Sequence, residues 1–312
     1  MRIGIVVDSA CDLGADYLRQ HAITVLPIRI HLGSDTLVDD RDPLAWQRFL
    51  AEGFGTRAQA AETEPYSVEQ VRELFLGRLV KDYDCVFCLT ISATRSPIYH
   101  NASQASFSIL KDYRPVRQAA GVPGPFLMRV IDTENLFAAQ GITAVEAVRL
   151  RSAGVNPGQM RERLEAIARS TYGYVVPRDL FYLRARTQKR GDRSVGLLSA
   201  TLGSALDIKP ILRAWRGETG PVGKARGFDA AVRTLFEHAA ARVRDGLLTP
   251  TLCVSYGGEL SELAALPGYA DLRGTCAAHG VECFESPMSV TGMVNLGTGA
   301  VALGYAAEEH AF

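Results

Sequence analysis

A run of hydroxyl side chains between residues 90 and 96 is the feature of this sequence best suited to bind a ligand. The hydroxyl residues are Thr90, Ser92, Thr94 and Ser96. They follow an apolar run, Cys85–Ile91, that is typical of a buried strand. Ser96 and Pro97 are then a favoured N-cap and a favoured first helical residue. Unpaired backbone N–H groups, the positive end of the helix dipole and Ser/Thr donors converge in such a turn. The pattern predicts a seat for a small anion, or for the polar end of a larger ligand. The alternative is that the serines only cap a helix.

A second strand ends in the same way. Residues 2–7 form a short apolar strand that runs into Asp8-Ser9-Ala10-Cys11-Asp12 before a helical segment. Open α/β sheets bind ligands in the crevice beyond the carboxyl ends of their strands. Ser9 and Asp8 are therefore further candidates for ligand contact, although Asx and Ser turns after a first strand are also common structural devices.

The elements that must position these side chains alternate along the first half of the chain. Strands are expected at 2–7, 23–30, 85–91 and 127–132, and helices at 12–21, 43–52, 68–81, 96–112, 138–153 and 157–169. That order predicts βαβ units and a mostly parallel, Rossmann-like sheet. Further strands at 172–176, 208–214 and 251–256, with a helix over 228–245, predict a second α/β domain. We expect an α/β protein with domains at 1–165 and 166–312.

Composition excludes several classes of function. The chain has 312 residues, 47% of them apolar, and 34 basic residues balance 34 acidic ones, which argues against nucleic-acid binding. No segment has the length of an apolar membrane span, and no secretory signal precedes the first strand. We therefore expect a cytoplasmic protein without stable membrane insertion, and six reduced cysteines.

Metal sites are not expected either. Cys85 and Cys88 have a spacing that can bind zinc, but within a strand their side chains point to opposite faces, so they are interpreted as core residues. His100 is interpreted as an exposed residue of the helix after Pro97. The other five histidines are scattered without ligand or triad spacing and are interpreted as structural: His21, His31, His238, His279 and His310.

Motifs in order along nearly the whole chain resemble those of DegV family proteins. They are IVVDSACDL at 5–13, ISATRSPIYHNA at 91–102, LDIKPIL at 206–212, KARG at 224–227 and GTGA at 297–300. The resemblance implies two α/β domains with one long-chain fatty acid between them. The family includes the lipid-binding subunit of bacterial fatty-acid kinase, which presents a carboxylate to a separate kinase that makes acyl phosphate.

The resemblance thus implies a non-catalytic lipid-binding protein that needs no cofactor. Asp39 and Arg226 match family positions that meet the kinase partner; the alternative is that they are ordinary surface charges. A second hypothesis is an enzyme that acts on a phosphorylated or acyl small molecule at the hydroxyl-rich strand ends. Against the enzyme, the sequence has no G-x-S-x-G elbow and no P-loop.

The resemblance also implies where a carboxylate head would bind, and this chain departs from the family pattern there. In the family's T-S-x-P turn, Thr63 is kept but Glu62 replaces a threonine, and in the serine-rich turn Ser92 and Ser96 are kept. Asn295 stands at the position of a histidine. Glu62 would repel a carboxylate, Arg95 would attract it, and Asn295 can donate a hydrogen bond without a charge. The family's ligand-site arginine is matched best by Arg186.

Overall fold

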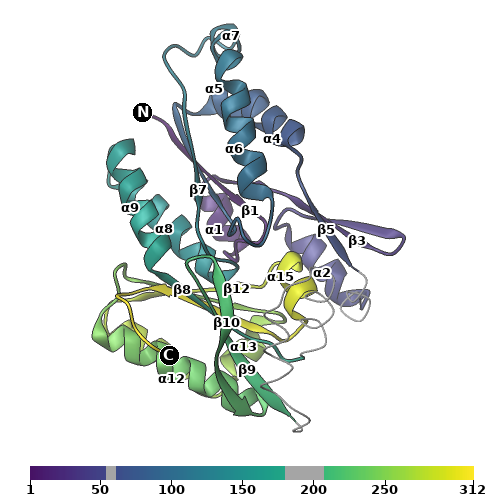
Figure 1. Ribbon diagram of the computed structural model, residues 1–312, viewed down its shortest axis with the longest axis vertical. Helices are drawn as coiled ribbons and strands as arrows, with labels where there is room; N and C mark the ends of the chain where they lie inside the picture. The colour runs from purple at the N-terminus through teal and green to yellow at the C-terminus, as the bar shows by residue number, and fades with distance from the viewer. Residues whose placement is uncertain (54–60, 180–206) are drawn as a thin grey trace.

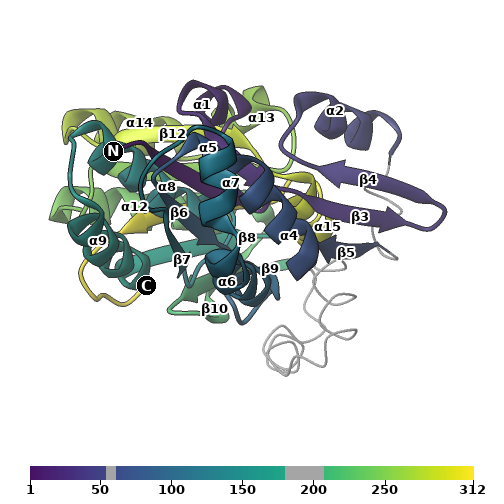
Figure 2. The ribbon, with the colours of Figure 1, turned by 90° about the horizontal axis from the view of Figure 1, so that it is seen from above.

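Two sheets of different topology stack on either side of a central helix (Figures 1 and 2). The computed structural model describes residues 1–53, 61–179 and 207–312. Arg186 lies outside these ranges. The expectation of a mixed α/β fold with a parallel sheet and a further sheet is confirmed.

The N-terminal sheet is parallel, with strand order β2-β1-β6-β7. Its strands are β1 (Ile3–Asp8), β2 (Ile23–Leu26), β6 (Cys85–Thr90) and β7 (Leu127–Asp132). All six residues of β6 are buried, as is typical of a strand covered on both faces. The helices of this half are α1 (Ala15–Gln20), α2 (Pro43–Ala51), α4 (Val68–Leu74), α5 (Val80–Asp82), α6 (Ile98–Ser108) and α7 (Tyr113–Ala119), with a π turn at Phe75–Leu79 and a 3₁₀ turn at Ile109–Lys111.

The expected strand at 23–30 is wrong in one respect, because it is two strands. Pro27 has no N–H for a sheet ladder, and the chain leaves the parallel sheet at this residue. The continuation, β3 (Ile28–Leu32), pairs antiparallel with β4 (Asp35–Asp39) and β5 (Glu62–Pro65). This small sheet carries Thr63 and Asp39.

The C-terminal sheet is mostly antiparallel, with strand order β10-β9-β8-β13-β11-β12. Its strands are β8 (Thr171–Val176), β9 (Ile208–Trp215), β10 (Glu218–Arg226), β11 (Thr251–Tyr256), β12 (Glu282–Pro287) and β13 (Val301–Ala306). The sequence patterns missed β10, none of whose residues is buried, and β12, of whose residues only Ser286 is buried; neither strand has an apolar run. The helices here are α12 (Phe228–Asp245), α13 (Leu260–Ala264), α14 (Tyr269–Ala278) and α15 (Val290–Leu296).

Helix α8 (Ala138–Ser152) joins the two halves. Its first eleven residues are buried all round, and it contacts β1 and β6 of one sheet and β8, β11 and β13 of the other. Small residues permit this close approach: a Cβ added at Gly304 would lie 2.3 Å from the Cα atom of Ala139. The next helix, α9 (Pro157–Ser170), runs across the predicted boundary between residues 165 and 166.

Candidate functional site

The turn between β6 and α6 holds the predicted hydroxyl cluster. Ser92 is buried, its N–H donates to the carbonyl of Asn135 at 2.8 Å, and its hydroxyl lies 3.0 Å from that of Thr94. Helix α6 spans Ile98–Ser108 rather than the expected 96–112, and its N-cap residue is Pro97 rather than Ser96. The half-buried Ser96 accepts a 3.4 Å hydrogen bond from the N–H of Ile98. Ser96 thus accepts one N–H at the start of α6 without being its N-cap residue, and ligand binding by these serines stays a prediction.

Asp8 holds this turn against the end of β1. Its buried carboxylate accepts hydrogen bonds from the N–H of Ile91 at 2.6 Å, from the N–H of Ala10 at 3.0 Å and from the amide of Gln140 at 3.1 Å. Burial raises the pKa of Asp8 to about 6, against the effect of these three donors. The neighbouring Ser9 is fully buried, and its hydroxyl has no hydrogen-bond partner among the described residues.

Helix α15 supplies the second part of the site, and the sequence analysis did not expect a helix here. Ser289 caps it by accepting a hydrogen bond from the N–H of Gly292 at 3.0 Å. Asn295 is half-buried in its last turn, where its amide donates to the carbonyl of Thr291 at 2.7 Å. In both ribbon views α15 lies beside β5, the strand of Glu62 and Thr63 (Figures 1 and 2).

Asp39 also belongs to this helix start. It is 2% exposed, and its carboxylate accepts hydrogen bonds from both the N–H and the hydroxyl of Thr291, each at 2.7 Å. Burial raises its pKa, and nearby Arg41 and the Thr291 donors oppose that rise. The interpretation of Asp39 as a surface charge is therefore wrong. A partner contact at this position stays a prediction, and the carboxylate itself is occupied by Thr291.

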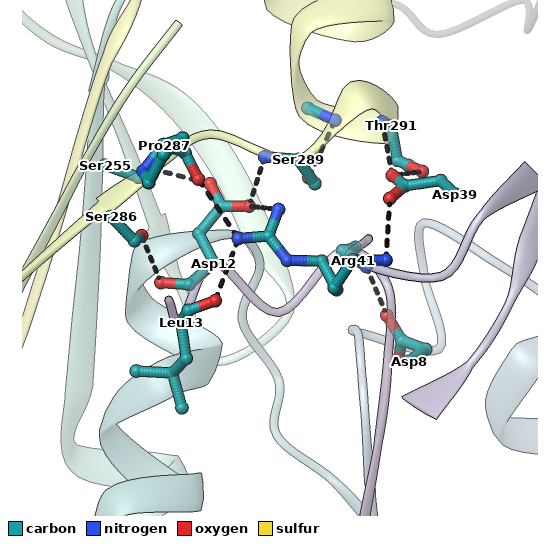
Figure 3. Close-up of polar contacts among 12 residues, drawn as sticks. Asp8, Asp12, Leu13, Asp39, Arg41, Ser255, Ser286, Pro287, Ser289 and Thr291 are labelled. Carbon is teal, nitrogen blue, oxygen red and sulfur yellow. Dashed lines mark hydrogen bonds and ion pairs between the residues drawn. The ribbon is translucent and has the colours of Figure 1, made fainter. Parts of the chain in front are cut away.

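A buried arginine connects the two domains beside Asp39 (Figure 3). The guanidinium of Arg41 donates to the carbonyl of Leu13 at 2.9 Å and to that of Pro287 at 3.0 Å, and it lies 3.6 Å from the carboxylate of Asp12. Asp12 in turn accepts hydrogen bonds from Ser255 at 2.6 Å and from the N–H of Ser289 at 2.8 Å.

The sequence analysis did not single out Arg41. The only sequence signal for this network was the place of Asp12 in the opening motif. Nothing in the sequence indicates that Asp12 contacts Arg41, 29 positions later, or β11. The network sets how the β1–α1 turn and the start of α15 meet.

The remaining predicted residues lie on β5, in the β6–α6 turn and at the end of β10. Glu62 is exposed and Thr63 half-buried on β5. Arg95 is half-buried, and its guanidinium donates to the hydroxyl of Thr219 on β10. Thr94, in the same turn, donates to the carbonyl of Gly217 at 2.7 Å. The hydroxyl-rich turn thus contacts the β9–β10 hairpin of the other domain. Arg226 is exposed at the end of β10.

A cleft of about 830 Å³ has one wall from each domain. Phe49 and Leu50 of α2 form part of one side, and the Tyr256–Glu259 turn, Thr298 and Gly299 form part of the other. Leu266 and Pro267 add apolar surface, while Arg178, Asp229, Glu259 and Glu262 bring charge. The turns that contain Gly257 and Gly299 are joined by backbone hydrogen bonds. The N–H of Gly257 donates to the carbonyl of Ala300, and the N–H of Gly299 donates to that of Gly257.

Cys85 and Cys88 are buried in β6, as expected of core residues. Burial raises the pKa of Cys85 to about 11 and that of Cys88 further. Across the described ranges, no group of three or more His, Cys, Asp or Glu side chains is arranged to hold a metal ion. Over the same ranges, no helix is both long and apolar enough to cross a membrane.

The family is decided by comparison of the whole chain. The model of the family described as "Uncharacterised protein, DegV family" matches residues 2–308. The chain belongs to the DegV family. A DegV domain-containing protein of Xanthomonas axonopodis pv. citri is 61% identical over 312 residues, which is 100% of this chain and 99% of that protein.

Solved DegV structures share the fold along its full length. DegV from Bacillus subtilis, described as a fatty acid binding protein, is 22% identical with a TM-score of 0.75, and the match covers 99% of this chain and 100% of that one. A stearic acid-binding protein from Eubacterium ventriosum is 22% identical with a TM-score of 0.74, covering 98% of each chain. A DegV family protein from Eubacterium eligens loaded with heptadecanoic acid is 20% identical with a TM-score of 0.73, covering 98% and 100%.

Proposed function

We propose that this DegV family protein binds one long-chain fatty acid between its two domains and acts as a carrier rather than as an enzyme. The observation that carries the proposal is the cleft between α2 and the C-terminal domain, in a fold shared end to end with DegV proteins described as fatty-acid binders. Its volume of about 830 Å³ is within the range of about 300–1,000 Å³ that small-molecule sites occupy.

The tail would supply most of the affinity. Each buried methylene contributes roughly 0.8 kcal/mol, so a long chain gains about 10 kcal/mol before the costs of association. Leu50, Leu266 and Pro267 offer apolar surface for it. The carboxylate then contributes orientation more than affinity.

The head would bind at the hydroxyl-rich turn. Ser92 and Ser96 offer hydroxyl donors there, and Asn295 offers an amide in the last turn of α15. Arg95 adds positive charge from the same turn, while the exposed Glu62 opposes a carboxylate. Thr63 is a further donor on the same strand as Glu62.

The identity of bound material tests the proposal directly. Native mass spectrometry of the purified chain, followed by organic extraction, is expected to show one long-chain fatty acid per chain. A chain that is empty, and stays empty after incubation with a panel of fatty acids, would contradict the proposal and favour an enzyme acting on a phosphorylated or acyl small molecule.

Two variants test the head seat separately from the tail. Ser96→Ala and Asn295→Ala are expected to lower fatty-acid retention without unfolding the protein. Ser106→Ala is the matched control, because Ser106 lies on α6, the helix that follows Ser96, and its hydroxyl donates within the helix to the carbonyl of Ser103 at 2.7 Å. Unchanged fatty-acid occupancy in both variants would exclude Ser96 and Asn295 from the binding of the carboxylate.

We further propose that the bound carboxylate is presented to a separate kinase that makes acyl phosphate. Such a role needs no cofactor on this chain, and the exposed Arg226 is available for a partner contact. All six cysteines are free thiols, which suits a cytoplasmic location. With ATP and the candidate kinase, hydroxylamine trapping is expected to detect acyl phosphate, at a lower rate for Arg226→Ala. The same rate for both proteins would exclude Arg226 from the contact.

A further inference from the structure

Two cysteines from different elements lie on the same side of the C-terminal sheet. Cys276 belongs to the inward stripe of α14, where Tyr269, Leu272 and Cys276 recur at helical spacing and are all buried. Cys283 is the second residue of β12 and packs in the same apolar cluster as this stripe, whereas the next residue, Phe284, packs in the other cluster. Side chains alternate between the faces of a strand, so both thiols lie between α14 and the sheet.

The turn from α14 to β12 holds the two cysteines close together. Gly280 has a positive φ of 66°, and the N–H of Val281 donates to the carbonyl of Cys276 at 2.9 Å, which closes the end of the helix. The hydroxyl of Tyr269, about two helical turns before Cys276, lies 3.9 Å from the Sγ atom of Cys283. The thiol of Cys283 also hydrogen-bonds that of Cys276. The fold therefore brings the two sulfur atoms into contact.

This contact distinguishes the pair from the cysteines of β6. Donation from the Cys283 thiol lowers the pKa of Cys276, and the same hydrogen bond, together with burial, raises the pKa of Cys283. Burial raises the pKa of both Cys85 and Cys88. Cys276 is 1% exposed, whereas Cys283 is partly exposed on β12, which is the last strand in the sheet order and therefore an edge. A buried thiol with a stabilised anion thus adjoins a thiol that solvent reaches.

We propose that Cys276 and Cys283 form a redox-active dithiol, which a small disulfide such as oxidised glutathione closes to a reversible intramolecular disulfide. The shared face, the sulfur contact and the access at the sheet edge support this role. Disulfides in a reducing compartment are usually transient and redox-sensing, which fits a pair that is free in the reduced protein.

The reaction is a two-step thiol–disulfide exchange. The thiolate of Cys283, the cysteine within reach of solvent, bonds to one sulfur of oxidised glutathione, and the other sulfur leaves as a glutathione thiolate. The thiolate of Cys276 then bonds to Cys283 and displaces the second glutathione thiolate. The protein loses two electrons and two protons, and oxidised glutathione gains them as two glutathione thiols.

The disulfide would fasten the end of α14 to the edge strand of the sheet. β12 ends at Pro287, whose carbonyl accepts the hydrogen bond of Arg41, so the linked strand is the one that reaches the other domain. The dithiol lies apart from the hydroxyl-rich turn, and the proposal does not depend on fatty-acid binding.

Equilibration of the full chain in glutathione redox buffers tests the dithiol. After acid quenching and alkylation in denaturant, intact mass spectrometry is expected to show one disulfide and four of the six thiols alkylated. Proteolysis after Glu282 separates the two cysteines unless they are linked, so the peptides of Cys276 and Cys283 should stay joined until a reductant is added. Because the native fold holds the thiols together, the equilibrium constant for closure should be at least ~10-fold larger than that of the urea-unfolded chain.

Three variants separate this pair from the other thiols. Cys283→Ser is expected to form no disulfide, and Cys276→Ser should stop at the mixed disulfide of Cys283 with glutathione. Cys253→Ser is the control, because Cys253 is a fully buried thiol on the neighbouring strand β11, and it should close like the parent. Circular dichroism of each variant checks that the fold is kept.

Three results, all obtainable with the parent chain, would overturn the proposal. The first is a native protein that stays fully reduced, or stops at a mixed disulfide, in buffers that oxidise the unfolded chain. The second is a closure constant no larger in the native than in the unfolded chain. The third is a disulfide that maps to cysteines other than Cys276 and Cys283.

Discussion

Replacing Arg41 by methionine tests whether the buried network in Figure 3 holds the two domains together. Methionine keeps an unbranched side chain of similar reach and removes every donor. The side chain of Arg41 is 7% exposed, and its guanidinium bonds a carbonyl from each domain, those of Leu13 and Pro287. The change also leaves the carboxylate of Asp12, which is fully buried, without a cation.

The expected cost follows from these contacts. A hydrogen bond from a charged donor contributes about 1.5–3 kcal/mol, and Arg41 makes two to carbonyls. Removing one partner of a buried ion pair costs about 3–5 kcal/mol, because the other charge stays buried. We therefore expect the free energy of unfolding to fall by about 3–5 kcal/mol.

Each domain carries its own fluorescent reporter. Trp46 lies on α2 and Trp215 on β9, so Trp215→Phe and Trp46→Phe backgrounds report the two domains separately in urea. The parent is expected to show coincident transitions. Arg41→Met should lower the midpoint and separate the two transitions, because the lost contacts cross the interface.

Two further variants define the outcome. Arg48→Met is the control, because that exposed arginine pairs with Glu52 on the helix surface and its loss should leave the midpoint unchanged. Adding Asp12→Asn to Arg41→Met should recover part of the loss, since it removes the stranded charge. A free energy of unfolding of Arg41→Met within about 1 kcal/mol of the parent value would refute the reasoning, because that is the contribution of an exposed ion pair. A double variant that is less stable than Arg41→Met would refute it as well.

Three further predictions concern the core. Because the folded pKa of Asp8 is raised to about 6 and an unfolded aspartate titrates near 3.8, stability from this group is present below pH 4 and lost as pH rises through 6. That loss is about 3 kcal/mol, and Asp8→Asn should flatten the profile of urea-unfolding free energy between pH 4 and 7. Gly304→Ala places a methyl group against the backbone of α8 and should lower the free energy of unfolding by about 1–3 kcal/mol. Gly274→Ala, in open space on α14, should raise it by about 0.5–1 kcal/mol. A higher urea midpoint for Gly304→Ala than for Gly274→Ala would contradict this. Cys85 and Cys88 should react with a thiol reagent only after unfolding. If they react as fast in the native protein as in the urea-unfolded protein, they are not buried in β6 as described.

Local pattern was sufficient for most elements of the fold. Apolar runs and helix signals predicted β1, β6, β7 and the long helices α8, α9 and α12, because burial on both faces and helical periodicity leave direct traces in the sequence. The hydroxyl run after β6 and its place before a helix were also readable. Pro27 is a signal for a break in the expected 23–30 strand, but the apolar residues on both sides of it favoured one continuous strand.

Tertiary structure alone decided which polar groups became partners. Asp39 reads as a surface charge until α15 brings Thr291 over it, and Arg41 has no visible role until Pro287 arrives from the other domain. His238 and His310 are 72 residues apart and meet only because the segment after β13 returns across the sheet toward α12. The reason is physical: the hydrophobic pattern encodes which face of an element is buried, whereas the partner of a buried polar group depends on contacts between distant segments that no local period records.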